Sequence, residues 1–347
     1  MNAYLQNVLD QPQALRSAMA TYEDQARSAI GILEKQHGRP DLVVFTGMGS
    51  SYCAGTVAAH YLNHRGVRAT AAESSDLLYF DLGGLTPKTW VILVSQSGES
   101  VEIHGLVDRL QEKVPVVAVA NVPDSYLATA VESRFLMGIS PDHSIAVKTY
   151  TGSILALLEV ASAIAGDPAG TWRPEFDAAL QAMESYLVHW EATMNHVFGA
   201  LGDAQYLSLL GRGPSYATAL EGALLLKEGA KINAEAMNGG QFRHGSIEVV
   251  DARYRGLVFS AAGVVGDLDQ RLTRQIAGSG GTVGLVSPQA PEVDSPTVHH
   301  VAMPRLNEFL APLVQIVPVQ LFTYRLAESR GVTPGHFRNT TPTIRTE

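Results

Sequence analysis

A short glycine-rich segment occurs twice in this sequence, each time directly after an apolar run with the length of a β-strand. Gly47-Met-Gly-Ser-Ser-Tyr52 follows Leu42-Val-Val-Phe-Thr46, and Gly211-Arg-Gly-Pro-Ser-Tyr216 follows Tyr206-Leu-Ser-Leu-Leu210. A glycine turn between a buried strand and a helix is typical of parallel α/β sheets, whose ligands bind at the carboxyl ends of the strands. One such turn is weak support, but two in equivalent places predict a duplicated α/β domain.

The remaining strand signals fit the same plan. A chain of 347 residues is long enough for two domains. Further apolar runs lie at 67–72, 91–94, 114–119, near Phe135, at 256–260 and at 282–286. Helical segments separate these runs, and parallel neighbours require such crossover helices. The sequence therefore predicts two tandem, doubly wound, flavodoxin-like parallel-sheet domains of the α/β class.

The expected domain organisation has five parts. They are N-terminal helices over 1–36, a first domain over 37–165, a linker and connecting helix over 166–203, a second domain over 204–330 and a C-terminal tail over 331–347. Within them we expect a helix break at Pro12, because proline disrupts a helix interior, and one connecting helix from Pro174 to Leu201.

Composition narrows the classes of partner. A formal net charge of -9 and an acidic balance disfavour a nucleic-acid scaffold. The longest apolar run, Ile154 to Ala165, contains Glu159 and is too short to span a bilayer. The first residues show no apolar signal region, so we expect a cytoplasmic protein without a membrane partner.

Metal and cofactor chemistry is not indicated. The single cysteine, Cys53, excludes an intrachain disulfide framework and a cysteine-built zinc site, and we expect it to be structural. The eleven histidines show no convincing paired ligand spacing, and His299-His300 lies in a stretch that reads as a loop. We expect no metal and no organic cofactor.

Hydroxyl groups gather after two of the predicted strands. Ser50 and Ser51 follow the first, and Ser95, Gln96, Ser97 and Ser100 follow the third. Backbone amides and hydroxyls at two helix N-termini could hold one phosphate group, although each serine could instead simply cap a helix. A dinucleotide site, with Glu73 as its ribose-binding acid, is disfavoured because Tyr52 replaces the third glycine of the fingerprint.

Two glutamates and a histidine in the second half are candidate acid–base groups. On an ideal α-helix Glu221 and Glu228 lie two turns apart on nearly the same face, with the apolar Leu225 between them. An apolar neighbour tends to raise a carboxyl pKa toward the range of a general base. Solvated helix glutamates are the alternative, and Lys227 and Lys231 are consistent with such a solvated face. His244, in the following loop, could equally be bonded to backbone.

Taken together, these motifs resemble a known family. Gly-x-Gly-Ser-Ser-Tyr, Ser-Gln-Ser-Gly-Glu-Ser, Ala219-Leu-Glu-Gly-Ala-Leu-Leu-Leu-Lys-Glu228, Ala234-Glu-Ala and Arg243-His-Gly245 occur in the same order in tandem sugar isomerase (SIS) domains. The chain is similar to the isomerase half of glucosamine-6-phosphate synthase and to stand-alone amino-sugar-phosphate deaminases, over nearly its whole length.

The resemblance implies a set of roles. The hydroxyl-bearing loop residues Ser50, Ser51, Ser95, Gln96, Ser97 and Ser100 would bind the sugar phosphate. Glu228 would move a proton between C1 and C2 through an enediol or enolamine. His244 would assist ring opening and would come from the neighbouring subunit, which implies a homodimer with shared sites.

Sequence differences from the synthase narrow the set of reactions expected of this chain. Leu225 and Pro342 stand where the synthase has lysines, and no N-terminal cysteine nucleophile is present, so glutamine amidotransferase activity is not expected. We expect an amino-sugar 6-phosphate deaminase/isomerase. A sugar-amine 6-phosphate deglycase and an aldose–ketose isomerase are alternatives, because all need one carboxylate beside C1 and C2. A non-catalytic phosphosugar sensor is the alternative from another class.

Overall fold

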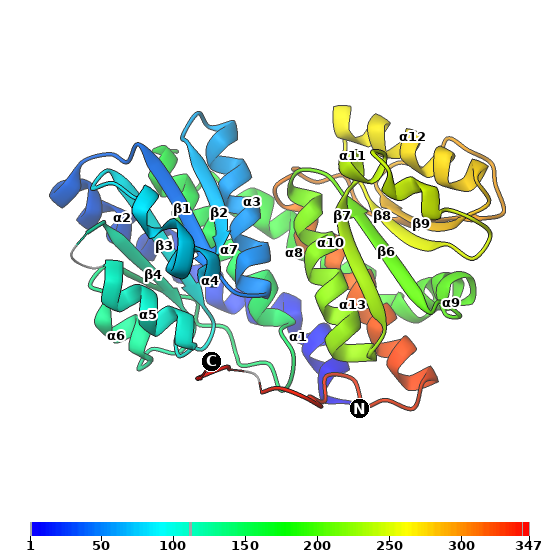
Figure 1. Ribbon diagram of the computed structural model, residues 1–347, viewed down its shortest axis with the longest axis horizontal. Helices are drawn as coiled ribbons and strands as arrows, with labels where there is room; N and C mark the ends of the chain where they lie inside the picture. The colour runs from blue at the N-terminus through cyan, green and yellow to red at the C-terminus, as the bar shows by residue number, and fades with distance from the viewer. Residues whose placement is uncertain (1, 111–112, 342, 347) are drawn as a thin grey trace. The chain divides into compact units, whose positions relative to one another are not determined.

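The chain folds into two compact units, seen here in a computed structural model that describes residues 2–110, 113–341 and 343–346 (Figure 1). The first domain comprises Gln13–Asp142, Ala146–Pro174 and the C-terminal residues from Phe337 onward. The second comprises the residues up to Pro12, His143–Ile145 and Glu175–His336. The tail therefore belongs to the first domain, although it follows the second in sequence.

The first domain is built on a five-stranded, wholly parallel sheet. Its strands are β1 (Leu42–Gly47), β2 (Ala69–Glu73), β3 (Thr89–Ser95), β4 (Val116–Ala120) and β5 (Arg134–Leu136). They lie in the order β2-β1-β3-β4-β5, the flavodoxin-like order, and the order reverses between β1 and β3. Residues of β3 and β4 are buried throughout, as expected of strands covered on both faces.

Helices cover both faces of this sheet. They are η1 (Met19–Thr21), α2 (Tyr22–His37), α3 (Ser50–His64), α4 (Ser74–Asp76), the π-turn η2 (Leu77–Asp81), η3 (Leu82–Gly84), α5 (Val101–Leu110), α6 (Tyr126–Ala130) and α7 (Lys148–Ala165). The π-turn η2 and helices α5 and α6 pack with β1, β3 and β4 in one apolar core. Helix α3 packs against β1, β2 and α7, and α2 packs against α7 and β5.

The second domain repeats this topology. Its parallel strands are β6 (Tyr206–Gly211), β7 (Asn233–Asn238), β8 (Arg255–Phe259), β9 (Thr282–Ser287) and β10 (Val298–Ala302). Their order, β10-β9-β8-β6-β7, is that of the first sheet when β6 is matched to β1. The predicted duplication and the predicted fold class are thus confirmed.

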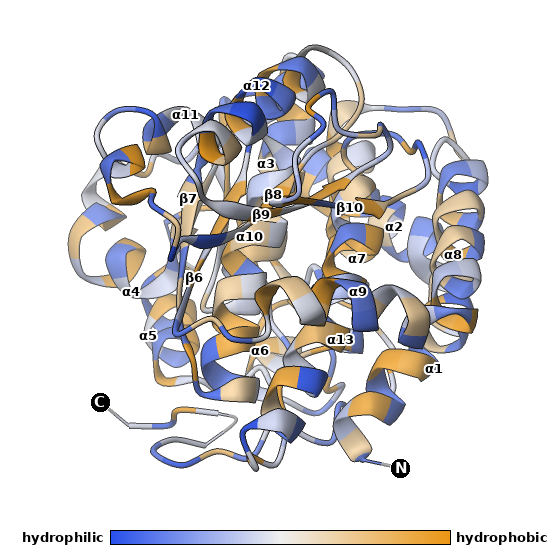
Figure 2. Ribbon diagram, turned by 90° about the vertical axis from the view of Figure 1, so that its right-hand side faces the viewer, coloured by the Kyte–Doolittle hydropathy of each residue, from blue (hydrophilic) through white to orange (hydrophobic). Residues whose placement is uncertain are grey.

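The second sheet also lies between helical layers. The helices are α8 (Arg173–Val188), α9 (Trp190–Leu201), α10 (Pro214–Leu225), the π-turn η4 (Leu226–Ala230), α11 (Gly239–Phe242), η5 (Ser246–Val249), α12 (Val264–Gly278) and α13 (Ala311–Ser329). Figure 2 shows β8 and β9 with α12 on one side and α9 and α13 on the other. Helix α12 turns an apolar face, with Leu272 and Ile276, toward β8 and β9.

The prediction of a helix break at Pro12 is wrong. Helix α1 (Ala3–Ala18) runs through Pro12. A proline at this position cannot donate to the carbonyl of Val8, four residues earlier. The side-chain amide of Gln11 donates to that carbonyl instead, at 3.1 Å, and so replaces the missing donor.

Two further expectations need correction. The connecting helix is interrupted at His189, between α8 and α9, where no glycine or proline marks a stop. His299 and His300 lie on strand β10, not in a loop. Strands β7 and β10 are the two edges of their sheet, and edge strands tolerate polar residues that hide the apolar signal.

Candidate functional site

The first glycine turn places Ser50 and Ser51 at the start of α3. A side chain on Gly47 would lie 2.6 Å from the Cβ of Ser51 and 2.8 Å from the carbonyl oxygen of Val94, so only glycine fits. Gly49 has φ 53, in the left-handed region that glycine prefers. Both serines are half-buried at the carboxyl end of β1.

The loop after β3 lies beside this turn, because β1 and β3 are paired neighbours. Ser95 is only 8% exposed, and its hydroxyl oxygen accepts the N–H of Gly98 at 3.0 Å. The hydroxyl of Ser97 accepts the N–H of Glu99 at 3.3 Å. Each hydroxyl keeps its own proton for a further acceptor. The other two predicted residues of this loop, Gln96 and Ser100, are half-buried.

Gly98 fixes this loop against the neighbouring loop that leads into α6. Its φ is 67, and an added Cβ would lie 2.3 Å from the hydroxyl oxygen of Ser125. The N–H of Leu127 donates to the carbonyl of Gly98 at 3.1 Å. The structure therefore brings all six predicted phosphate-binding residues to one end of the first sheet, beside the N-termini of α3 and α5.

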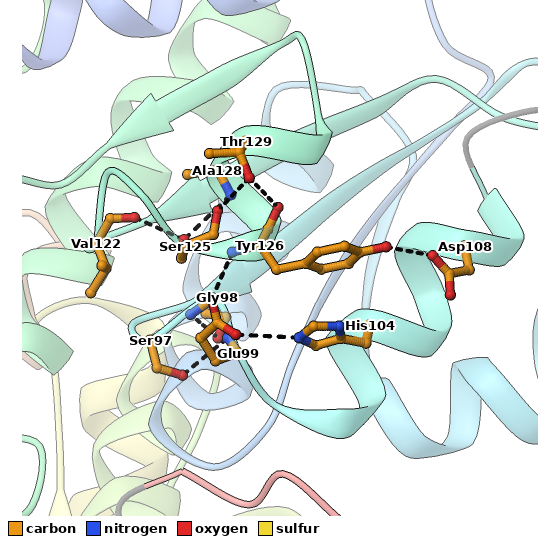
Figure 3. Close-up of polar contacts among 11 residues, drawn as sticks. Ser97, Gly98, Glu99, His104, Asp108, Val122, Ser125, Tyr126, Ala128 and Thr129 are labelled. Atoms are coloured by element: carbon orange, nitrogen blue, oxygen red, sulfur yellow. Dashed lines mark hydrogen bonds and ion pairs between the residues drawn. The ribbon is translucent and has the colours of Figure 1, made fainter.

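The role of Glu99 in this loop was not predicted from the sequence (Figure 3). Its carboxylate accepts the N–H of Tyr126 at 2.7 Å and lies 3.4 Å from Nε2 of His104. The hydrogen bond from Tyr126 is the main reason that the pKa of Glu99 is lowered. The His104 ring stacks on the Tyr126 ring with centroids 4.0 Å apart, and Tyr126 donates to Asp108 at 2.5 Å. The acidic residue within the motif Ser-Gln-Ser-Gly-Glu-Ser is the sequence signal that could have identified it.

The C-terminal tail meets the same loop. The carbonyl of Ile344 accepts the N–H of Val101, the first residue of α5, at 3.1 Å. The positive charge of Arg345 also contributes to the lowered pKa of Glu99. Pro342, which stands where the synthase has a lysine, lies outside the described residues.

Glu228, the predicted base, lies in the second domain on the π-turn that extends α10. Because α10 gives way to a π-turn at Leu226, Glu221 and Glu228 are not two ideal turns apart as expected. Glu221 and Leu225 are each 1% exposed, so Glu221 is not a solvated glutamate. Glu228 is half-buried, and burial raises its pKa, while Lys231 and Lys227 partly lower it.

His244 follows α11 and is exposed, with its backbone N–H donating to Gln241 at 2.9 Å. It lies beyond the carboxyl end of β7, whereas Glu228 precedes the amino end of that strand. Figure 1 shows α11 at the arrowhead end of β7. A six-residue strand is about 20 Å long at 3.3 Å per residue. One chain therefore does not bring its own Glu228 and His244 together.

The turn after β6 holds the loop that leads to His244. Arg212 lies 3.3 Å from the carboxylate of Asp269, a residue with 0% exposure. Burial raises the pKa of Asp269 to about 7. A Cβ on Gly239 would lie 2.5 Å from Nη1 of Arg212, so the first residue of α11 rests directly on this pair.

Within the described residues, His, Cys, Asp and Glu side chains form no group of three or more that could hold a metal ion. Cys53 is buried in α3.

None of the helices in the described part of the chain is both long and apolar enough to cross a membrane.

Comparison with known proteins agrees with this architecture. The sequence profile of the SIS domain matches residues 40–164 and again 201–329. These two matches cover more than half of the chain and contain the two sheets. The chain therefore belongs to the SIS domain family, as the motifs indicated.

Its relatives include proteins of several activities. The chain is 27% identical, over 99% of its length, to the glutamine–fructose-6-phosphate aminotransferase of Pyrococcus horikoshii, but it spans only 57% of that protein. Glucosamine-6-phosphate deaminase from Thermotoga maritima is 18% identical with a TM-score of 0.76, covering 99% of both chains. Tagatose-6-phosphate ketose/aldose isomerase from Escherichia coli is 21% identical with a TM-score of 0.80, covering 96% of this chain and 94% of that one.

Proposed function

We propose that this SIS protein is an enzyme that converts an amino-sugar 6-phosphate and water into a ketose 6-phosphate and ammonia. The observation that carries the proposal is Glu228, a half-buried carboxylate with a raised pKa on a π-turn. Burial that raises the pKa of a carboxyl group makes its carboxylate better suited to accept and return a proton.

The phosphate is assigned to the first domain. Ser50, Ser51 and the loop 95–100 lie where α3 and α5 begin. Helix N-termini present unpaired N–H groups and a positive dipole end, and both favour a dianion. Among the loop hydroxyls, Ser97 is half-buried and oriented by the N–H of Glu99. We assign Ser95 two roles, phosphate binding and stabilising the loop conformation, because its hydroxyl oxygen accepts the N–H of Gly98.

The reaction needs one base and one water molecule. Glu228 removes the proton from C2 of the open-chain amino sugar while the C1 carbonyl oxygen takes up a proton, which gives an enolamine. Glu228 then returns its proton to C1 while the C2 amino group loses one N–H proton, so that the amine at C2 becomes an imine. Water then adds to the imine carbon, and ammonia leaves with the C2 nitrogen. One carboxylate serves both proton steps, and the sum is substrate plus water giving ketose phosphate plus ammonia.

His244 is assigned to ring opening, and it is supplied by a second copy of the chain. The support is the separation of Glu228 and His244 by the length of β7 within one chain. An isologous dimer would place each copy's His244 in the other copy's site and would give two equivalent sites.

Aldose–ketose isomerisation is the second candidate, because the likeness to tagatose-6-phosphate ketose/aldose isomerase is as extensive as the likeness to the deaminase. An isomerase would use the same proton transfer without loss of nitrogen. A deglycase would release an amine other than ammonia from a sugar-amine phosphate, and a sensor would bind without turnover.

A substrate panel separates these functions. We would incubate the protein with hexosamine, hexose and sugar-amine 6-phosphates and follow ammonia by a coupled assay and the sugars by NMR. Ammonia release from a hexosamine phosphate is the expected result. Aldose–ketose exchange without ammonia would show the isomerase instead.

Replacing the base tests its role. Glu228→Gln should reduce kcat by about 10³-fold, within the range for general bases, and leave phosphosugar binding nearly unchanged. Glu248→Gln, an exposed glutamate on η5, is the control and should keep full activity. Near wild-type turnover in Glu228→Gln would show that another group is the base.

A further inference from the structure

Lys231 has an unusual backbone. Its φ of 57 and ψ of 39 place it in the left-handed helical region, and among the described residues no other non-glycine residue has a positive φ. Side-chain-bearing residues pay a steric penalty there, and glycine or asparagine is the usual occupant. The strained backbone makes the side chain of Lys231 a candidate for a functional role.

The lysine side chain folds back on the turn that carries Glu228. Its Nζ donates a hydrogen bond to the carbonyl oxygen of Glu228. Its backbone N–H donates to the carbonyl of Leu226 and closes the same π-turn. The next residue, Ile232, donates to that Leu226 carbonyl at 3.3 Å. Lys231 thus stabilises the turn through hydrogen bonds from both its backbone N–H and its side-chain Nζ.

The turn is also constrained at Gly229, which packs closely against α13 and Ile145. A Cβ on Gly229 would lie 2.4 Å from Cγ2 of Thr323 on α13 and 3.3 Å from Cδ1 of Ile145. The backbone next to Glu228 is therefore packed against uncharged groups, whereas the Lys231 ammonium lies at the Glu228 carbonyl.

The other charged groups on the packed elements are engaged elsewhere or lie within the core. Glu221 on α10 is buried. Glu235 on β7 accepts from Tyr206. On α13, Arg325 donates to Asn195, and Glu328 accepts from Tyr324. The charges that lower the pKa of Glu228 are those of Lys231 first and Lys227 second.

We propose that Lys231 is a positioning residue for Glu228: its left-handed backbone and its hydrogen bond to the Glu228 carbonyl fix the π-turn, and its ammonium favours the ionised form of the carboxylate. The inference rests on the proposed role of Glu228 as the base. Lys231 acts through Glu228 and is not assigned a contact with substrate.

Three variants separate charge from backbone geometry. Lys231→Asn keeps a residue that tolerates the left-handed region but removes the ammonium. Lys231→Arg keeps a positive charge. Lys227→Met removes the exposed charge on the same turn and is the matched control. The measurements are the pH profile of kcat/KM and the thermal midpoint of each protein.

The expected direction follows from the sign of the charge effect. Lys231 lowers the pKa of Glu228, so its removal raises that pKa, and the base becomes protonated at a higher pH. The acid limb of the profile should move to higher pH in Lys231→Asn, with kcat at neutral pH reduced about tenfold, a small part of what a general base contributes. The thermal midpoint should change little, because asparagine tolerates the left-handed backbone better than lysine and so offsets the lost hydrogen bond. Lys231→Arg should recover most of the profile, and Lys227→Met should shift the limb less.

Two results would overturn the proposal. One is an unshifted acid limb in Lys231→Asn at wild-type kcat. The other is an equal loss of activity and of thermal midpoint in the Asn and Arg variants, which would make the role purely structural.

A second measurement does not depend on turnover. NMR titration of ¹³C-labelled glutamate carboxyls, with the Glu228 signal assigned by its loss in Glu228→Gln, gives the pKa of Glu228 directly. A higher pKa in Lys231→Asn supports the proposal even if no panel substrate reacts, an outcome that would count against the proposed function alone. An unchanged pKa would refute the charge effect of Lys231 whatever the reaction is.

Discussion

The two glycine turns have nearly the same backbone and different surroundings. Gly49 and Gly213 have φ values of 53 and 51, and each precedes the first residue of a helix, α3 or α10. In the first turn Ser50 and Ser51 are half-buried. In the second, Pro214 takes the place of a serine, and Ser215 is 1% exposed. The duplicated scaffold has kept its geometry in both halves, while half-exposed hydroxyls remain in one.

The loops one strand further on differ in the same way. After β3 the chain carries Gln96, Ser97 and Ser100, all half-buried. After β8, Ser260 is buried and is followed by Ala-Ala-Gly before α12 begins. A parallel sheet offers the same end for binding in each domain. At this end the two domains therefore differ in side chains that the topology does not specify.

The largest expected effect contrasts two glycines. Gly98→Ala places a Cβ against Ser125 at positive φ and should lower the free energy of unfolding by about 4 kcal/mol, from overpacking and left-handed strain together. In Gly213→Ala the added Cβ meets no atom within 4 Å, so the variant should lose only the backbone strain energy, about 1–3 kcal/mol. Urea unfolding of both variants gives the difference. Equal losses would mean that the two turns are equally constrained.

A smaller effect is expected for two serines. Ser97→Ala should weaken binding of a hexose 6-phosphate about 10- to 30-fold, because one hydrogen bond to a charged group contributes about 1.5–2 kcal/mol. Ser215→Ala should leave this binding unchanged, although its hydroxyl is buried in the matching turn. Calorimetric titration measures both. Weakened binding in Ser215→Ala instead would assign the phosphate to the second domain.

The sequence predicted most of the scaffold, because buried parallel strands are continuous apolar runs. It failed where polar residues occupy edge strands, as in β7 and β10, and where Gln11 compensates for Pro12. The serines could be placed at one end of the first sheet from their position after strands. The contacts of Glu99, the π-turn at Glu228 and the left-handed Lys231 could not, since they depend on tertiary packing that no local pattern encodes.

The position of β7 between Glu228 and His244 has a consequence for activity in dilute solution and in mixtures. If each working site takes its histidine from a second copy, specific activity must fall on dilution as the copies separate by mass action. Two inactive proteins, Glu228→Gln and His244→Ala, should also restore each other when mixed. In a statistical mixture half of the dimers are mixed, and each has one intact site, so about a quarter of the wild-type activity should return. A mixture that stays inactive would place both groups' functions within a single chain.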